Sequence, residues 1–178
     1  MKYERKRTAM TQKQSFFAVF CIEAVADELN TTGDQVYKML TDESDILDNY
    51  IVPCYDVLHT QGKEYIVEDL KGMMEKRGVQ NQSPVNDEQA IWLRQCAQRM
   101  IANRTLVGNK CADVIKAYAA FEKIPLREAF DVFYRSYLYL EIRHGVSDMH
   151  CRSDGYLAEE LQMEVGRKQP LKQRKGNP

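Results

Sequence analysis

One stretch decides the organisation of the chain: Tyr55-Asp56-Val57-Leu58-His59-Thr60-Gln61-Gly62-Lys63-Glu64-Tyr65-Ile66-Val67-Glu68-Asp69-Leu70. A divergent version of it returns as His150-Cys151-Arg152-Ser153-Asp154-Gly155-Tyr156-Leu157-Ala158-Glu159-Glu160-Leu161. An offset of 91 residues aligns the two histidines, the two tyrosines, the two acidic pairs and the final leucines without a gap. We therefore expect two copies of one small unit in tandem.

The apolar residues around this stretch recur at helical spacing. Ile66, Leu70, Met73 and Met74 stand at i, i+4, i+7 and i+8, which predicts a helix over residues 63–77 that Gly78 ends. The same pattern predicts helices over 15–29, 33–40, 46–52, 87–103, 109–123, from Pro125 onward, and from a Ser153 cap to about residue 165. No segment alternates as a strand would. The sequence therefore predicts an all-α fold of two small helical bundles packed in tandem.

Helix boundaries follow from local signals. Thr32, with Gln35 three residues on, fits a capping box for the second helix, and Ser44 or Asp45 can cap the third. Pro53 is expected to end or kink that third helix at Val52 and to open a further helical stretch through residue 58.

The domain limits follow from composition. Residues 81–87 are polar and contain a proline, so they separate a first unit over 14–80 from a second, divergent unit over 84–165. A second correspondence, at an offset of 93, sets 31–37 against 124–130. Residues 1–13 and 166–178 have no apolar periodicity, and we expect flexible, basic and disordered ends.

Charge is distributed unevenly along the chain. Residues 1–13 carry a net charge of +4 and residues 166–178 carry +5, which leaves −10 on residues 14–165. An acidic body disfavours nucleic acid and suits a basic protein partner. A DNA-binding regulator that works through its basic ends is kept as a further alternative.

The five cysteines are odd in number and have no C-x-x-C spacing. Reduced thiols that pack as small apolar side chains explain them best, which indicates the cytoplasm. No apolar run approaches the roughly 18 residues of a membrane helix. We expect no cofactor and no membrane contact, and the sequence leaves homo-oligomerisation open.

His59 and His150 are the first candidates for chemistry because both copies keep the residue. Each could act as a general base, or bind a metal or pair with a thiol, which gives an enzyme as the main alternative. A metal site usually needs three or four ligands, and each copy aligns only one histidine, so we predict no metal site. We favour structural roles for both histidines, for Gly62 and for Ser153. Loss of His59 is then expected to cost about 1–3 kcal/mol through buried neighbours left without a partner.

Tyrosines and carboxylates are the candidates for binding. Glu68-Asp69 and Glu159-Glu160 are adjacent pairs whose side chains point about 100° apart on a helix, which is poor geometry for shared catalysis. An acidic edge facing a partner, with tyrosines as anchors, fits them better. The predicted contact residues are Tyr37, Tyr65, Glu68, Asp69, Tyr137, Tyr139 and Tyr156.

The run from Tyr55 to Gly62 followed by Tyr65-Ile66-Val67-Glu68-Asp69 resembles the core of a small uncharacterised bacterial all-helical domain family. The stretch over 146–161 resembles a second variant of that core, without the Tyr-Asp and the glycine. The resemblance implies no known catalytic residues. It also implies a gene neighbourhood, since such domains are often encoded beside ADP-ribosyltransferase-like toxins. We therefore expect a non-enzymatic protein-binding module, an antitoxin-like neutraliser or adaptor for a partner of that type.

Overall fold

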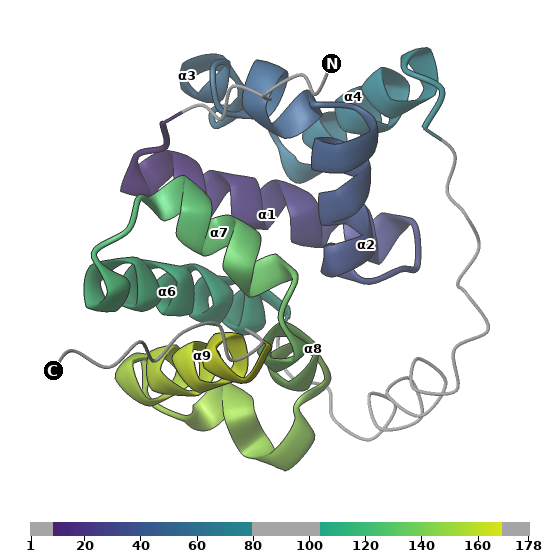
Figure 1. The fold of residues 1–178 in the computed structure, drawn as a ribbon. Coiled ribbons are helices and arrows are strands. Elements are labelled where there is room, and N and C mark those ends of the chain that lie inside the picture. Colours follow the sequence, from purple (N-terminus) through teal and green to yellow (C-terminus); the bar gives the residue numbers. More distant parts are fainter. Residues whose placement is uncertain (1–8, 80–103, 169–178) are drawn as a thin grey trace, which may run out of the picture.

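The computed structural model describes residues 9–79 and 104–168, and all their regular structure is helical. The all-α prediction is therefore confirmed. Figure 1 shows the arrangement of the elements. In chain order they are α1 (Gln12–Glu28), α2 (Gly33–Lys38), the π-helical turns η1 (Met39–Glu43) and η2 (Leu47–Ile51), α3 (Tyr55–Leu58), α4 (Lys63–Lys76), α6 (Arg104–Glu122), α7 (Leu126–Tyr134), α8 (Tyr137–His144), the 3-10 helix η3 (Val146–Cys151) and α9 (Asp154–Lys168).

The first helix begins three residues earlier than its apolar pattern predicts. Thr11 forms a capping box with Gln14, in which each side chain satisfies a backbone N–H at the helix start. The capping box expected at Thr32 is absent: Thr32 precedes α2 without a side-chain cap, and the side chain of Gln35 accepts from Thr31 instead.

The segment between α2 and α4 differs most from the helices that spacing predicts. The predicted second helix continues through η1, and the predicted third helix is the short turn η2. Asp45 takes a left-handed backbone conformation with φ of 54°, and Ser44 donates to the carbonyl of Met39, so neither residue caps η2 as we expected. Pro53 follows Val52, where the helix was predicted to end, and α3 follows as expected.

Of the remaining predicted helix boundaries, the structure confirms one and corrects two, and the others lie outside the described residues. Gly78 has φ of 70° just after α4, as the predicted terminator requires. The helix predicted over 109–123 begins earlier, at Arg104, and α9 continues to Lys168, so residues 166–168 are helical and not disordered. The predicted linker over 81–87, the predicted helix over 87–103 and residues 169–178 lie outside the described residues.

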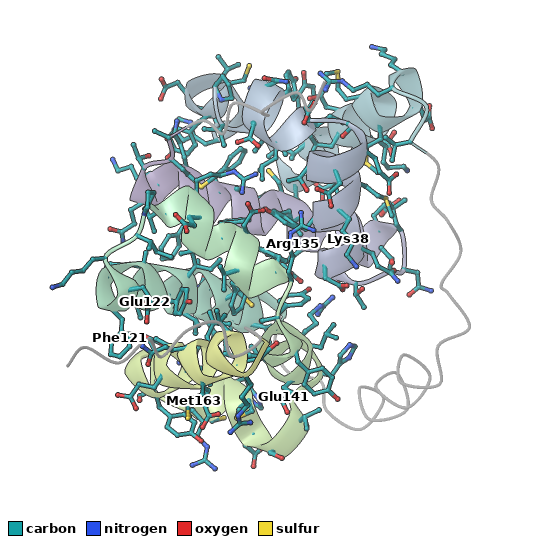
Figure 2. The ribbon with its side chains drawn as sticks, in the orientation of Figure 1. Lys38, Phe121, Glu122, Arg135, Glu141 and Met163 are labelled. Carbon is teal, nitrogen blue, oxygen red and sulfur yellow. The ribbon has the colours of Figure 1, made fainter. Side chains whose placement is uncertain are left out.

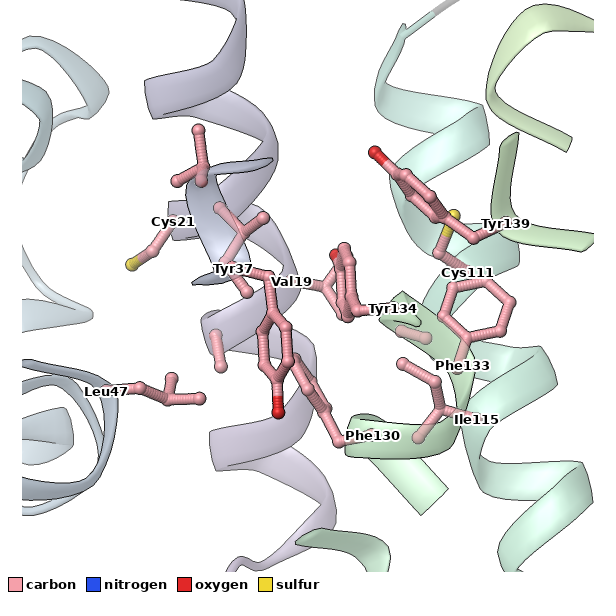
Figure 3. Close-up of a cluster of buried hydrophobic side chains, with 14 of the residues drawn as sticks. Val19, Cys21, Tyr37, Leu47, Cys111, Ile115, Phe130, Phe133, Tyr134 and Tyr139 are labelled. Atoms are coloured by element: carbon pink, nitrogen blue, oxygen red, sulfur yellow. The ribbon is translucent and has the colours of Figure 1, made fainter. Parts of the chain in front are cut away.

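The halves share one core. Within the first half, α1 packs against α2 and α4; within the second, α6 packs against α7 and α9; and α1 packs against α6 across the middle. Figure 3 shows the centre of this core, where the Tyr37 ring packs against Phe130 and Tyr134 of α7, and the Tyr139 ring packs against Tyr134. One buried cluster runs from Ala18 to Leu161, so the two halves are joined by an apolar interface.

Burial follows the same register in both halves. At an offset of 93, six buried positions of α1 match six of α6, from Ala18 with Cys111 to Ala26 with Ala119. The same offset matches buried Val36, Tyr37, Leu40 and Thr41 with buried Ala129, Phe130, Phe133 and Tyr134. At an offset of 91, buried Ile66, Val67 and Leu70 of α4 match buried Leu157, Ala158 and Leu161 of α9.

No helix in residues 9–79 and 104–168 combines the length and the apolar composition of a membrane-spanning helix.

Candidate functional site

The outer face of α4 carries the first group of predicted contact residues. Tyr65 is 57% exposed, and Glu68 lies one turn later with 74% of its side chain accessible. Asp69 is half-buried because its carboxylate accepts from the Tyr50 hydroxyl at 2.6 Å. That hydrogen bond to a carboxylate raises the pKa of Tyr50 to about 12. We call Tyr65, Glu68 and Asp69 the first face.

The outer face of α9 carries the matching group. Tyr156 is 43% exposed, and its hydroxyl bonds to the Glu160 carboxylate, which raises the tyrosine pKa. The Arg152 guanidinium lies 5.9 Å from the centre of the Tyr156 ring, and Glu159 is exposed. We call Tyr156, Glu159 and Glu160 the second face. Each face therefore carries one exposed tyrosine and two carboxylates at matched positions.

The second face is bordered by α8. The Glu164 carboxylate accepts from the backbone nitrogens of Tyr137, at 2.7 Å, and Leu138, at 3.1 Å, and so holds the start of α8 against α9. The Tyr137 side chain stays 42% exposed. Burial, then the neighbouring charges of Glu164 and Glu160, raise the pKa of Glu141. Three carboxylates, those of Glu141, Glu160 and Glu164, thus lie near one another where α8 meets α9.

Apolar side chains lie uncovered on this second half. Met163 on α9 is 44% exposed and Phe121 on α6 is 49% exposed; Figure 2 labels both. Neither residue is among the predicted contact residues. Their helical spacing alone could not separate an uncovered apolar side chain from a core one.

Two of the predicted contact residues are not on the surface. Tyr37 and Tyr139 are 0% exposed, because both rings pack in the aromatic cluster between the halves. The prediction that they contact a partner is wrong for this conformation. Their hydroxyls instead belong to two buried polar networks that join the halves.

The first network surrounds Glu23, which lies on α1 with 9% exposure. Its carboxylate accepts from the Tyr139 hydroxyl at 2.9 Å and lies 3.1 Å from the Arg143 guanidinium. The Tyr139 oxygen in turn accepts from the backbone N–H of Gly33 at 2.8 Å. Burial, which exceeds the opposing effect of Arg143, raises the pKa of Glu23. The sequence does contain a sign of this network, because Glu23 is a charged residue on the apolar face of the first predicted helix.

The second network surrounds Arg127, whose guanidinium donates to both carboxylate oxygens of Asp48, at 2.9 and 2.8 Å. It also donates to the Tyr37 hydroxyl at 2.8 Å, and that hydroxyl donates to Asp131. Only 6% of the Arg127 side chain and 12% of the Asp48 side chain are accessible. Every group in this network acts within the interface between the halves.

His59 differs from the partly buried histidine that we expected. Its ring is exposed and stacks on Tyr55 with 4.5 Å between ring centres. The ring nitrogen Nδ1 lies 2.7 Å from the carbonyl oxygen of Tyr55, one helical turn earlier. Within the part of the chain that the structure describes, the contacts of His59 are therefore local to α3.

His150 has a different environment. It lines a cavity of about 460 Å³ together with Cys151 and, from α6, Lys110 and Asp113. Its Nδ1 atom is buried and has no hydrogen-bond partner within the part of the chain that the structure describes. Lys110 is engaged by Asp154 at 2.7 Å. Across residues 9–79 and 104–168, no group of three or more His, Cys, Asp or Glu side chains could hold a metal ion.

Ser153 and Gly62 are the other two residues for which we predicted a structural role. The Ser153 hydroxyl accepts from the backbone nitrogen of Tyr156 at 3.3 Å, which is the expected cap of α9. Gly62 precedes α4 with φ of −71°, and a Cβ there would meet nothing nearer than Glu64 at 3.7 Å. A glycine is therefore not sterically required at residue 62.

Comparison with known proteins identifies one family model. A model described as "Protein of unknown function (DUF3791)" matches residues 16–77, which correspond to the first half from α1 to the end of α4. The match indicates an uncharacterised domain family for that half. No curated protein and no solved structure matches the chain significantly.

Proposed function

We propose that the chain is a non-enzymatic protein-binding module, made of two related helical units, that binds a basic partner through its acidic tyrosine faces. The observation that carries this proposal is the repetition of one surface. Tyr65 and Tyr156 are exposed at matched positions, and each is followed on its helix by two carboxylates. A surface role explains why both copies keep an exposed aromatic ring that packing does not require.

The shared burial register supports the relation between the units. The residues that face the core recur at offsets of 93 and 91, while the tyrosines and the acidic pairs recur on the outside. A duplicated unit would keep both patterns, because the inner pattern maintains the fold and the outer one maintains binding.

The chemistry of the faces selects the kind of partner. Tyrosine is enriched at the centres of protein interfaces, where its ring is buried and its hydroxyl forms a hydrogen bond. The carboxylates around it attract Lys and Arg and speed encounter with a basic surface. The net charge of −10 over residues 14–165 acts in the same direction.

The family resemblance suggests one candidate partner, an ADP-ribosyltransferase-like toxin encoded beside this chain. The proposed mechanism is steric: an acidic face covers a basic substrate-binding cleft of the toxin. Reduced cysteines support a cytoplasmic setting, since Cys21, Cys54, Cys111 and Cys151 are all free thiols.

Co-expression with the neighbouring toxin tests the proposal. The parent chain is expected to restore growth and to co-purify with the toxin. Tyr65→Ala and Tyr156→Ala are each expected to weaken binding at least about tenfold, and Glu68→Lys to slow association. Glu43→Lys is the control, because Glu43 is exposed on η1 and undergoes the same charge change. Toxicity that persists with the parent chain present would refute the toxin as partner, and equal effects of Glu68→Lys and Glu43→Lys would refute the face.

A second candidate function is an enzyme or small-molecule site at His150. The observation that favours it is the cavity that places His150 and Cys151 beside Asp113, with a volume in the range of ligand pockets. His150→Ala separates the two proposals. Neutralisation and partner binding that are unchanged by this substitution support the binding module, whereas loss of an activity with binding intact supports the enzyme.

A further inference from the structure

Equivalent residues of the two halves meet at the interface. At the offset of 93, Tyr37 corresponds to Phe130 and Asp42 to Arg135. The Tyr37 and Phe130 rings lie 5.8 Å apart, and Arg135 binds the Asp42 carboxylate at 2.8 Å. Contact between equivalent positions is the property of a two-fold interface, in which the same patch is used on both sides. The halves therefore pair about a local two-fold axis.

Contacts away from this axis are reciprocal, as such symmetry requires. The beginning of α7, at Arg127, contacts Asp48 in η2 of the other half. The beginning of α2, at Gly33, contacts Tyr139 in α8 of the other half. In both cases the start of the second helix of one unit meets the segment that follows the equivalent helix of the other unit.

The charges at the matched positions of these helices are inverted. Three positions one turn apart carry opposite signs in the two units: Asp34 corresponds to Arg127, Lys38 to Asp131, and Asp42 to Arg135. The order is negative, positive, negative along the first unit and positive, negative, positive along the second. Figure 2 shows Arg135 reaching from α7 toward α2, where Lys38 is labelled.

We propose that this inverted charge stripe is a pairing code, which makes the second unit the partner of the first and rejects a second copy of the first. If two copies of the first unit paired in this geometry, the position of Arg127 would be taken by Asp34, opposite Asp48. The position of Arg135 would be taken by Asp42, opposite another Asp42. Each of the two ion pairs would thus become two carboxylates in contact.

Burial of the ion pairs makes the pairing of two copies of the first unit strongly unfavourable. Arg127 and Asp48 are almost inaccessible to water, so like charges in their place would be unscreened. Asp42 and Arg135 are about half-exposed. Their ion pair therefore contributes little to stability and acts mainly on which units pair. The apolar surfaces of the two units are alike in register, and the charges are therefore what tells them apart.

Charge reversal in the full chain tests the code. An acidic variant carries Arg127→Asp and Arg135→Asp, and a basic variant carries Asp42→Arg and Asp48→Arg. Each places like charges across its own interface and is expected to lower Tm by about 6–20 °C. A fourfold variant with all these changes restores opposite charges and is expected to recover at least about half of that loss as a monomer.

Mixing provides the sharper measurement. After joint refolding of the acidic and basic variants, each intact unit finds its complement only on the other chain, so light scattering should detect a 1:1 dimer. Lys76→Asp with Arg167→Asp is the control, because both side chains are exposed and the net charge change equals that of the acidic variant. The code is refuted if either reversed variant keeps the parental Tm, if the fourfold variant recovers nothing, or if mixing yields no dimer. None of these measurements involves an external partner, so their failure would leave the proposed function standing.

Discussion

Replacement of Gly33 by alanine is expected to disrupt the interface between the halves. A Cβ at residue 33 would overlap the Tyr139 hydroxyl oxygen and come within 2.5 Å of the Glu23 carboxylate. Neither atom is free to move away. The Tyr139 hydroxyl bonds to both the Gly33 N–H and Glu23, and the other Glu23 oxygen is held by Arg143 at 3.1 Å.

The magnitude follows from these contacts. Forcing an extra methyl group into a packed core costs about 1–3 kcal/mol. If the Tyr139 hydroxyl moves away, the buried N–H at residue 33 loses its acceptor, which costs about 1–3 kcal/mol more. The total is about 2–6 kcal/mol, and for a chain of this size each kcal/mol lowers Tm by about 2–4 °C. We expect Gly33→Ala to lower Tm by about 4–24 °C.

Urea and thermal denaturation measure this effect, and Gly72 supplies the matched control. Gly72 lies inside α4 with nothing within 4 Å of an added Cβ. Alanine there gains helix propensity without a clash, so Gly72→Ala is expected to stabilise the chain by about 0.5–1 kcal/mol. The two substitutions add the same methyl group and are expected to act in opposite directions.

The Tyr139→Phe background isolates the clash. Phenylalanine removes the hydroxyl that the new Cβ would overlap, so Gly33→Ala should cost less on that background than in the parent chain. Two results would contradict this account of the clash with the Tyr139 hydroxyl. One is a Gly33→Ala protein that is as stable as the Gly72→Ala protein. The other is an equal cost of Gly33→Ala on the parent and Tyr139→Phe backgrounds.

Three further results are expected. His59→Ala should change the free energy of unfolding by no more than about 0.5 kcal/mol in urea titrations, because the ring is exposed; this replaces the larger cost expected from sequence, and a loss above about 1 kcal/mol would restore it. Because the pKa of Glu23 is raised in the folded chain, the stability that this group contributes falls as pH rises from about 4.5 through the folded pKa. The parent chain should therefore gain stability relative to Glu23→Gln when pH drops from 7 to 5, and a constant difference would contradict this. In the native protein an alkylating reagent should modify exposed Cys151, while burial, which raises the pKa values of Cys21 and Cys111, should protect those thiols until urea is added.

The helices were predictable where burial has a helical period. Ile66, Leu70 and Met74 mark the inner side of α4 in the sequence, and the structure buries all three. The turns η1 and η2 were not predictable in this way. Their wider turns depend on contacts made from outside the segment, such as the hydrogen bond from Arg77 to the carbonyl of Ser44. A periodic pattern carries no information about such contacts.

The candidate site was predictable only in part, because tyrosine suits two environments. Tyr65 and Tyr37 have the same apolar ring and polar hydroxyl, and both stand at the edge of an apolar helical pattern. Tyr37 is buried because Arg127 and Asp131, both from the other half, provide partners for its hydroxyl. The sequence cannot show where a distant residue will offer such a partner, so exposure could not be assigned to either tyrosine in advance.

The inverted charges are a second case in which the sequence shows the residues but not the distant partners that they meet. The alternation of Asp34, Lys38 and Asp42 is visible in the sequence, and taken alone it predicts only a solvated helix face with pairs one turn apart. The ion pair between Arg127 and Asp48 shows what these charges do at the interface. The residue of the first unit that is equivalent to Arg127 is an aspartate, which could not form this ion pair. Two units that bury the same positions would pair with themselves as readily as with each other unless some other property distinguished them. In this chain the distinguishing property is the sign of the charge at equivalent positions, and it acts only because a local two-fold axis brings those positions together.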